Sequence, residues 1–433
     1  MKRKIYDKLL QWKDSNNRKP LIVFGARQVG KTYVIREFCK NEFANFYEVN
    51  LFEKTDIIEL YESNQNADEK YRQLLSFCGI QNEDENTVLF VDEIQESPTL
   101  ISNLKYINEN HPELRIICAG SLLGVMLKRS DNKKSFPVGK VDMLTMYQLD
   151  FEEYLMAFNE VSLIEEIRKH YGNNTPMLES MHNKALNYYT SYLYTGGMPE
   201  AVQNIVDNDR NIALFDNSIV ENITKSYFED MYKYVANSTE TVKIERIFSS
   251  VPSQLGNDSH KFQYNKINSD ARKRDYDSSL DWLLSSRIVL KSNNVKTPKY
   301  PLNGFIDLDI FKIYMNDIGI LRNMLNISYS NILNNDFKGI MAENYVAFHL
   351  KSLGYNLLYY KNDSSTLEID FLYQNENGII PIEVKSAENT QSKSLNSFIQ
   401  KYNPVYSIKV STKNFGFVNN IKSIPLYAVF LIK

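Results

Sequence analysis

A run of consecutive residues near the N-terminus has the types and spacing of a loop that binds phosphate groups. The run comprises Gly25, Ala26, Arg27, Gln28, Val29, Gly30, Lys31 and Thr32. In such a loop the two glycines let the backbone bend until its N–H groups point at phosphate oxygens. The Lys31 ammonium would reach the β- and γ-phosphates of a nucleotide, and the Thr32 hydroxyl would bind Mg²⁺. The sequence therefore predicts that the chain binds ATP together with Mg²⁺.

Three polar residues that follow apolar stretches add the chemistry of hydrolysis. Asp92 and Glu93 end the apolar run 87–91, and Ser121 ends the run 114–120. Asp92 would hold the Mg²⁺ through water, and Glu93 would orient and polarise the water that attacks the γ-phosphate. Ser121 would reach the γ-phosphate or the same water. Alone, such residues often only cap a strand or a helix. Downstream of a phosphate-binding loop, they predict an ATPase in which Glu93, Ser121 and the lysine of the loop are catalytic.

A second set of charged residues lies near the C-terminus. Asp370 precedes a turn at 375–378, and Glu383 and Lys385 follow it. Glu383 and Lys385 are two residues apart, so on a strand they share one face. Asp370 and Glu383 would bind Mg²⁺ or Mn²⁺, Glu343 could add a ligand, and Lys385 would stabilise or deprotonate an attacking water, as in metal-dependent nucleases. A surface hairpin with a chance alternation of Glu and Lys gives the same pattern, so both interpretations stay open.

Strands and helices that alternate along the chain must position the first set. Apolar runs predict strands at 21–24, 87–93, 114–121 and 141–149, of which 87–93 and 114–121 should be buried, and an alternating pattern predicts a strand at 45–52. Helical patterns separate these runs, which predicts an α/β fold with a doubly wound parallel sheet. From residue 150 helices dominate, a β wing or connector is expected at 291–302, and the C-terminal part again mixes helices and strands.

These residues carry a resemblance that covers nearly the whole chain and keeps its order. The segments 25–32, 89–95, 119–121, 149–154 and 196–200 resemble bacterial and archaeal AAA+-type ATPases that carry a restriction-endonuclease-like C-terminal domain. The segment 311–320, together with Glu343, Asp370 and 383–385, is similar to the C-terminal region of the same family.

The resemblance implies four consecutive parts. They are a P-loop ATPase core at 1–150, a helical lid at 151–225, a winged-helix-like region at 226–325 and a small α/β restriction-endonuclease-like domain of the PD-(D/E)xK type at 326–433. It also suggests assembly into a homo-oligomer. Most members of the family are functionally uncharacterised, so the resemblance implies architecture more than biology.

One departure from the family pattern concerns charge near the nucleotide. The family often shows Gly-Arg before its fifth strand, where this chain has Gly139 and Lys140. Lysine lacks the bidentate fork of arginine, so catalysis is expected to be weak if this position serves phosphates in trans. Arg272 and Arg274 are candidates for an arginine that acts on the γ-phosphate, although a solvated helix face explains them equally well.

Composition restricts the class of protein. The chain has 433 residues, 43% hydrophobic and 24% charged, with a net charge of −3. This balance gives no global attraction to nucleic acid or anionic lipid. No apolar run approaches the about 18 residues of a membrane span, and the basic start has no signal-peptide core behind it. Three scattered cysteines are too few for a disulfide framework, so we expect a cytoplasmic protein without a membrane.

The C-terminal tail gives a weak argument for DNA as a partner. Residues 386–433 hold six lysines and one acid, Glu388, interleaved with Tyr402, Tyr406, Phe415 and Phe417. Lysines could follow phosphates and aromatic rings could stack on bases, but core aromatics with solvated lysines are the commoner explanation.

The leading hypothesis is an ATPase switch coupled to a nuclease-like or DNA-binding module. The alternatives are a nucleotide-dependent adaptor that holds a protein partner, and a nuclease gated by ATP.

Overall fold

The computed structural model describes residues 1–121, 136–235, 237–257, 261–334, 336–362, 364, 366–386 and 392–433. The chain divides into two compact units. The N-terminal unit contains Lys2–Gln148 and also Ser285–Arg287. The C-terminal unit contains Met1, Leu149–Leu284 and Ile288–Lys433. Glu388 of the basic tail lies outside the described residues. Within these ranges no helix combines the length and apolar character needed to cross a membrane.

The N-terminal unit is built on a five-stranded sheet in the order β2-β3-β4-β1-β5. Its strands are β1 (Leu21–Phe24), β2 (Asn45–Asn50), β3 (Thr87–Asp92), β4 (Arg115–Gly120) and β5 (Asp142–Thr145). Every neighbouring pair in this sheet is parallel. All residues of β3 and β4 are buried, as expected for central parallel strands covered on both faces. The predicted doubly wound parallel sheet is therefore confirmed.

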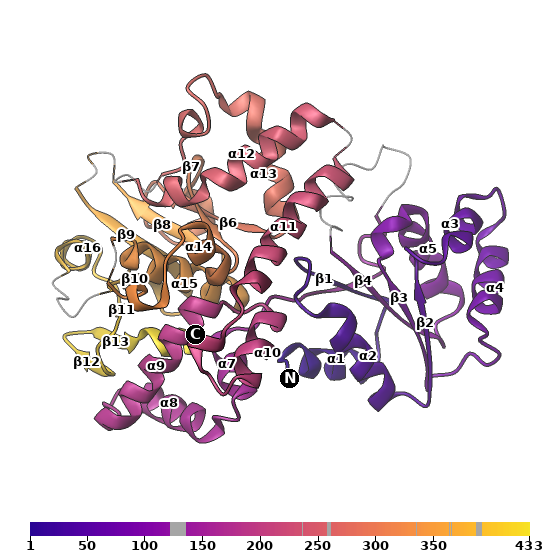
Figure 1. Cartoon of the computed structure of the whole chain (residues 1–433), viewed down its shortest axis with the longest axis horizontal. Coiled ribbons are helices and arrows are strands. Elements are labelled where there is room, and N and C mark those ends of the chain that lie inside the picture. Colours follow the sequence, from indigo (N-terminus) through magenta and orange to yellow (C-terminus); the bar gives the residue numbers. More distant parts are fainter. Residues whose placement is uncertain are drawn as a thin grey trace. The chain divides into compact units, whose positions relative to one another are not determined.

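Helices cover both faces of this sheet (Figure 1). They are α1 (Ile5–Lys13), α2 (Lys31–Glu42), α3 (Thr55–Glu62), α4 (Ala67–Cys78) and α5 (Pro98–Asn110), with a 3₁₀ turn at Ile94–Glu96. The helices α3, α4 and α5 bury their apolar residues against one face in a single core with Leu89, Val91 and Ile116. The helix α2 begins where the phosphate-binding loop leaves β1, so the sheet places this loop at the carboxyl ends of its strands.

The C-terminal unit begins with a helical region. It comprises α7 (Phe151–Ala157), α8 (Val161–Asn173), α9 (Glu179–Thr195), α10 (Pro199–Asp207), α11 (Asn217–Tyr234), α12 (Ser238–Leu255) and α13 (Lys273–Ser285), whose last residue belongs to the N-terminal unit. Three further helices follow later in the chain, α14 (Ile318–Met324), α15 (Lys338–Ser352) and α16 (Lys393–Tyr402). The 3₁₀ turns are Ile212–Leu214, Tyr264–Lys266, Leu302–Phe305, Tyr329–Asn331 and Leu426–Leu431.

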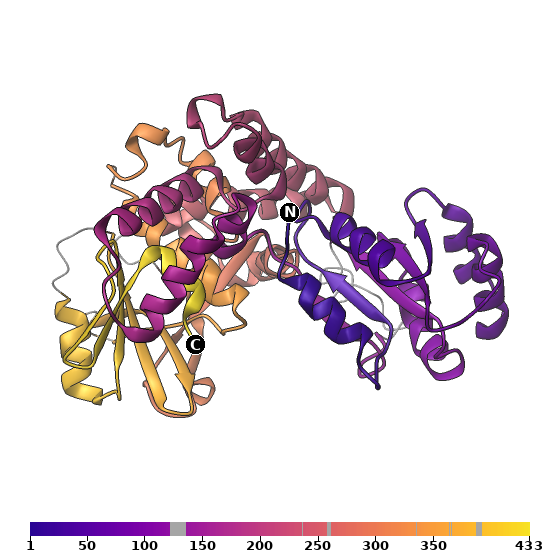
Figure 2. The same ribbon diagram turned by 90° about the horizontal axis from the view of Figure 1, so that it is seen from below.

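An eight-stranded mixed sheet forms the rest of this unit, in the order β12-β13-β11-β10-β9-β8-β6-β7. Its strands are β6 (Val289–Val295), β7 (Ile306–Met315), β8 (Leu358–Lys361), β9 (Glu368–Asn375), β10 (Gly378–Val384), β11 (Ser407–Ser411), β12 (Gly416–Val418) and β13 (Ile421–Pro425). Figure 2 shows the last strands, in yellow, beside the orange strands that precede them. The helix α15 contacts β7 and β10, and α16 contacts β9.

The first part of the stretch expected to be a wing or connector, residues 291–295, belongs to this sheet. The strand β6 continues to Val295, pairs antiparallel with β7 and also pairs parallel with β8. Two polar residues of this strand, Ser292 and Asn294, are typical of loops in a sequence. In the structure both are buried, and the Asn294 side chain accepts a hydrogen bond of 3.0 Å from the Lys361 N–H. Regions 226–325 and 326–433 therefore contribute strands to one common sheet.

Two of the segments that carry the family resemblance, 196–200 and 311–320, contain glycines that pack against each other. Gly196, at the end of α9, has φ +75°, and a Cβ added there would lie 2.3 Å from Asp317 Oδ1 and 2.9 Å from the Gly319 Cα. A Cβ added at Gly319 would lie 2.5 Å from the Thr195 carbonyl oxygen. The end of α9 and the start of α14 thus approach so closely that only glycine fits at both positions.

Candidate functional site

The phosphate-binding loop links the buried strand β1 to α2 with the backbone bends that its glycines permit. Gly30 immediately precedes α2 with φ 90°, and Gln28 has φ 65°. A Cβ at Gly25 would lie 2.0 Å from the Met146 carbonyl oxygen, so no other residue fits at the start of the loop. The N-terminal end of α2, with its unpaired N–H groups, therefore faces the space that the loop encloses, which is the arrangement that binds anions.

The lysine and threonine of the loop lie in defined positions. Lys31 is buried, and its Nζ donates hydrogen bonds to the carbonyl oxygens of Gly25 at 3.1 Å and Ala26 at 2.8 Å. Lys31 Nζ also lies 3.4 Å from Ser121 Oγ, at the end of β4. The Thr32 hydroxyl donates a hydrogen bond of 2.8 Å to Asp92 Oδ2, at the end of β3. The structure thus brings together four of the predicted site residues from three separate segments of the chain.

Two carboxylates follow each other at the end of β3 but have different surroundings. Burial raises the pKa of Asp92, the hydrogen bond from Thr32 opposes this rise, and the charge of Glu93 adds to it. Glu93 has φ 53°, a left-handed conformation that turns its side chain out of the strand direction. The Gln95 side-chain amide donates a short hydrogen bond to Glu93 Oε2. Gln95 therefore fixes the position of the predicted general base.

One residue that supports the loop could not be predicted from the sequence. Arg3, which lies just before α1, is buried. Its Nη1 donates to the Val29 carbonyl oxygen at 2.9 Å, and its Nη2 donates to the Tyr147 carbonyl oxygen at 2.6 Å. The arginine therefore ties the middle of the phosphate-binding loop to the segment after β5. In the sequence it is only one of three basic residues that precede the first helix.

The predicted C-terminal residues also lie close together, on β9, β10 and α15. Phe371 pairs with Ile382 in the antiparallel register, which makes Asp370 and Glu383 neighbours across the two strands. Asp370 Oδ2 accepts a hydrogen bond of 2.7 Å from the Val384 N–H. Burial raises the pKa of Asp370 well above its ordinary value, and the charges of Glu383 and Glu343 add to the rise.

Glu383 is the most informative member of this cluster. Its Oε1 forms an ion pair with Lys385 Nζ at 2.7 Å. Its Oε2 is buried and has no hydrogen-bond partner. Burial raises the pKa of Glu383, while Lys385 opposes this rise. A buried carboxylate oxygen without a donor fits a site for a cation, although no three Asp, Glu, His or Cys side chains of the described residues are grouped so that they could hold a metal ion.

Sequence reasoning missed a buried lysine in the same region. Lys312 on β7 is fully buried, and its Nζ lies 2.9 Å from both Glu343 Oε1 and Glu368 Oε1. The Tyr314 hydroxyl donates a hydrogen bond to the same Glu343 oxygen at 2.5 Å. A lysine between apolar Phe311 and Ile313 was the signal available in the sequence, because a charged residue within an apolar strand needs a buried partner.

Other charged residues singled out in the sequence lie on the surface. Lys140 Nζ pairs with Glu109 Oε1 at 2.7 Å. Arg272 and Arg274 are exposed, and Arg274 lies 3.5 Å from the carboxylate of the adjacent Asp275. In the described part of the chain, these contacts favour a solvated surface for all three.

The aromatic residues of the tail mostly pack inside the C-terminal unit. The Tyr402 and Tyr406 hydroxyls lie 2.8 Å and 2.7 Å from the hydroxyls of two other tyrosines. Phe415 is buried, whereas Phe417 is 47% exposed. The tail therefore offers Phe417 as an exposed ring, Phe415 belongs to the core, and Tyr402 and Tyr406 are half-buried.

Comparison with known families assigns the N-terminal unit to a class. Residues 17–155 match a family model described as an AAA domain. Residues 186–331 and 338–429 match two models described as domains of unknown function, DUF8612 and DUF4143. No curated protein matches the chain. With its parallel sheet and phosphate-binding loop, the N-terminal unit is a P-loop domain of the AAA type, a class that binds ATP.

Solved structures give only distant similarities. The Walker-type ATPase PABY2304 of Pyrococcus abyssi is 15% identical with a TM-score of 0.45, over 75% of this chain and 96% of that one. The Aeropyrum pernix ORC1 protein in complex with DNA is 12% identical with a TM-score of 0.29, over 75% and 90%. The Drosophila ORC bound to DNA is 13% identical with a TM-score of 0.30, over 74% and 94%. Similarities this low do not indicate a shared function.

Proposed function

We propose that this protein is a Mg²⁺-dependent ATPase that acts as a switch for a DNA-binding or nuclease-like C-terminal module. The single observation that carries the first half is the contact between Thr32 and Asp92, 2.8 Å long, beside the buried Lys31. This contact supports the proposal, because a hydroxyl and a carboxylate side by side after a phosphate-binding loop are the ligands that Mg²⁺ bound to a triphosphate takes from the protein.

Each residue of the site has a distinct role in this proposal. The N–H groups of the loop and the Lys31 ammonium bind the β- and γ-phosphates and stabilise the charge that develops on them. Thr32 and Asp92 would hold Mg²⁺, which supplies positive charge between the phosphates when it is bound. Glu93, oriented by Gln95, would accept the proton of the attacking water, and the Ser121 hydroxyl would contact the γ-phosphate.

The second half of the proposal rests on the cluster around Glu383. Asp370 and Glu383 would hold a divalent ion. Burial raises the pKa of both carboxyls, the charge of Glu383 adds to the rise at Asp370, and the charge of Glu343 adds to both. A bound Mg²⁺ or Mn²⁺ supplies the charge that offsets this repulsion and polarises water. Lys385, paired with Glu383, would stabilise the phosphate of a DNA backbone during cleavage or binding.

Phosphate release by the purified full chain, measured with and without DNA, tests both halves. We expect Mg²⁺-dependent turnover that Lys31→Ala and Glu93→Gln abolish, while Lys31→Ala alone also weakens ATP binding. Lys140→Ala serves as a matched control, because Lys140 pairs with Glu109. Turnover that persists in Lys31→Ala would overturn the ATPase assignment. Turnover that DNA does not change, together with no retention of DNA, would overturn the coupling.

A second function, that of a nucleotide-dependent adaptor, is favoured by the buried Lys312. Its ammonium already neutralises Glu343 and Glu368, so part of the acidic cluster has a structural partner and needs no metal ion. In an adaptor, the C-terminal module would hold a protein partner and ATP would act as a switch without DNA chemistry.

Plasmid DNA separates these functions. It is incubated with Mg²⁺ or Mn²⁺ and with wild-type protein or Asp370→Ala. Nicking by wild type that Asp370→Ala abolishes supports a nuclease, and nicking that also changes with ATP supports a gated nuclease. Equal, absent cleavage with no DNA retention supports the adaptor.

A further inference from the structure

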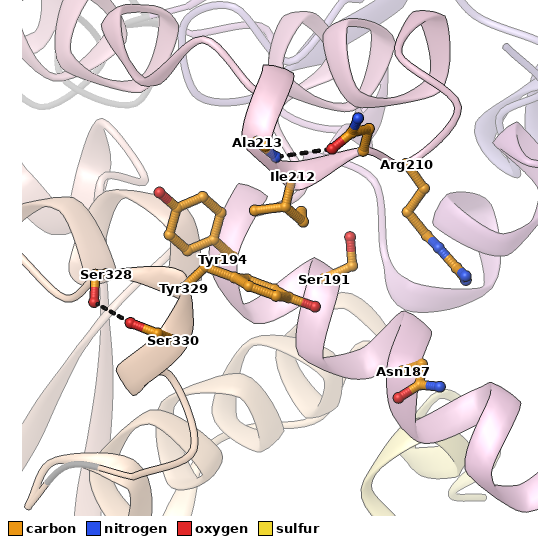
Figure 3. Close-up of a pocket in the computed structure, with 10 residues that line it drawn as sticks. Asn187, Ser191, Tyr194, Arg210, Ile212, Ala213, Ser328, Tyr329 and Ser330 are labelled. Atoms are coloured by element: carbon orange, nitrogen blue, oxygen red, sulfur yellow. Dashed lines mark hydrogen bonds between the residues drawn. The ribbon is translucent and has the colours of Figure 1, made fainter.

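The C-terminal unit contains an open cavity that the proposed ATPase chemistry does not use. Its volume is about 680 Å³, within the range of sites for small molecules. Its lining comes from α9, from the segment after α10 and from the turn at 328–330. All lining residues fall within 186–331, the region that matches a domain of unknown function. Figure 3 shows these segments facing one another.

Arg210 supplies the single formal charge of this lining. Its guanidinium lies over the Tyr188 ring, 4.0 Å from the ring centroid. Its Nη1 is buried and has no hydrogen-bond partner. The nearby carboxylate of Glu160 is occupied by other donors, Lys184 Nζ and the Tyr188 hydroxyl, each at 2.6 Å. The cation is therefore held over the Tyr188 ring, and as the charged residue of the described lining it is the group that an oxyanion in the cavity would pair with.

The backbone around Arg210 fixes this orientation. Asp209 and Arg210 have φ 50° and 61°, so two successive residues other than glycine are left-handed. The Arg210 N–H donates to the Ile205 carbonyl oxygen at 2.9 Å, which closes the turn against the end of α10. Sparsely populated conformations of this kind persist where the surrounding structure determines them.

The rest of the lining is neutral and partly aromatic. Among the described residues that form it, none is acidic. The Tyr194 and Tyr329 rings meet edge to face with centroids 5.4 Å apart, and Tyr329 remains 37% exposed. The Ser330 hydroxyl lies 3.1 Å from the Ser328 hydroxyl, and the two form a polar part of the rim (Figure 3). One positive charge with a half-exposed aromatic ring beside it suits a ligand that has one oxyanion and one planar ring.

We propose that this cavity binds a small molecule that carries a carboxylate or phosphate group on an aromatic ring, with Arg210 pairing the oxyanion and Tyr329 contacting the ring. The proposal does not depend on ATP binding, because no lining residue belongs to the N-terminal unit. A carboxylate and a phosphate ester share the required chemistry, and the test distinguishes them.

Calorimetric titration of the full chain with benzoate and with phenyl phosphate, at millimolar concentrations, provides this test. Benzamide keeps the ring without the charge, and inorganic phosphate keeps the charge without the ring. We expect one or both aromatic anions to bind more tightly than benzamide and inorganic phosphate. Binding of benzoate alone would identify a carboxylate ligand, and binding of phenyl phosphate alone would identify a phosphate ester.

Variants test whether the binding occurs in the cavity. Arg210→Gln should weaken it about tenfold, as expected for a lost charge-assisted hydrogen bond. Arg210→Lys, which keeps the charge and loses the fork, should have an intermediate effect, and Tyr329→Ala should also weaken binding.

Arg246→Gln, a change at an exposed arginine of α12, is the control and should leave binding unchanged. Circular dichroism checks that each variant is folded. No binding by either anion, binding as tight by benzamide, or equal binding by folded Arg210→Gln and Arg210→Lys and the wild type would overturn the proposal.

Discussion

The Thr32 hydroxyl donates a hydrogen bond of 2.8 Å to Asp92 Oδ2 and so connects the first turn of α2 with the end of β3. Burial raises the pKa of the Asp92 carboxyl, and this hydrogen bond opposes the rise. The hydroxyl therefore stabilises the ionised form of the carboxylate that the proposed Mg²⁺ site needs. The two proposed Mg²⁺ ligands are positioned by the sheet and the helix that carry them.

Thr32→Val removes this hydroxyl with little change in shape. We expect Mg²⁺ to strengthen ATP binding by the wild type and to have little effect on the variant, because the variant lacks one ligand and the donor to Asp92. A loss of about tenfold in affinity in the presence of Mg²⁺ corresponds to one such interaction. Calorimetry with and without Mg²⁺ measures the difference. Thr190→Val, in the C-terminal unit, is the matched control, and equal Mg²⁺ dependence in Thr32→Val would contradict the assignment.

Gly196 and Gly319 provide a test of packing in the C-terminal unit. Gly196→Ala places a Cβ 2.9 Å from the Gly319 Cα at a position with φ +75°. We expect this change to lower the free energy of unfolding by about 1–3 kcal/mol, the usual cost of overpacking, and Gly319→Ala to do the same. Chemical denaturation measures both.

Gly172→Ala is the control for this test, because a Cβ at Gly172 in α8 meets nothing within 4 Å. It should stabilise the protein by about 0.5–1 kcal/mol, since alanine favours a helix. Similar effects of all three substitutions would show that the contact between α9 and α14 has no special role.

The sequence predicted the N-terminal sheet well because two of its inner strands, β3 and β4, are continuous buried runs followed by polar residues. The loop at 25–32 follows such a run, so its position at a strand end could be derived directly. Strand β6 was missed beyond residue 290, since buried Ser292 and Asn294 look like loop residues. Their burial depends on partners distant in the chain, such as Lys361, which periodicity cannot reveal.

Contacts between residues distant in the chain also explain why Arg3 and Lys312 were not predicted at the two sites. Asp370, Glu383 and Lys385 lie on adjacent strands joined by one turn, so local spacing was sufficient to place them together. Arg3 reaches Val29 and Tyr147, and Lys312 reaches Glu343 and Glu368. These contacts join segments that no local pattern relates, and only the folded chain reveals them.

Asp317 gives a prediction for pH dependence. Burial raises its pKa from 3.8 to about 6, although the Gly197 and Ile320 N–H groups oppose the rise. Between these two values the folded protein binds more protons than the unfolded chain, so stability falls as pH rises through this window. The shift is worth about 3 kcal/mol at neutral pH.

Asp317→Asn isolates this contribution from those of other carboxylates. As pH rises from about 4 to about 7, the unfolding free energy of the wild type should fall relative to that of the variant. Above this range the difference should stay constant. Denaturation curves across this pH range measure it. Parallel pH profiles of the two proteins would show that Asp317 does not titrate with a raised pKa.

Glu383→Gln tests the proposed metal site through stability. The raised pKa means that the ionised carboxylate is disfavoured in the folded state at neutral pH, so the neutral amide should stabilise the metal-free protein. Mn²⁺ should raise the melting temperature of the wild type and have little effect on the variant. Glu376→Gln, at an exposed turn residue, is the control. An equal response to Mn²⁺ in Glu383→Gln would exclude Glu383 as a ligand.

Lys312 offers the sharpest test of whether the buried cluster is held together by a protein cation. Lys312→Met removes the ammonium that lies 2.9 Å from both Glu343 and Glu368. Two carboxylates then lose a buried partner, and we expect a loss of about 3–5 kcal/mol in unfolding free energy. Lys312→Met combined with Glu343→Gln should recover part of this loss, because the double variant leaves one fewer uncompensated charge. Lys361→Met, which removes a more exposed cation from Glu368, should cost much less. Equal stability of the single and double variants would mean that Glu343 and Lys312 do not stabilise each other.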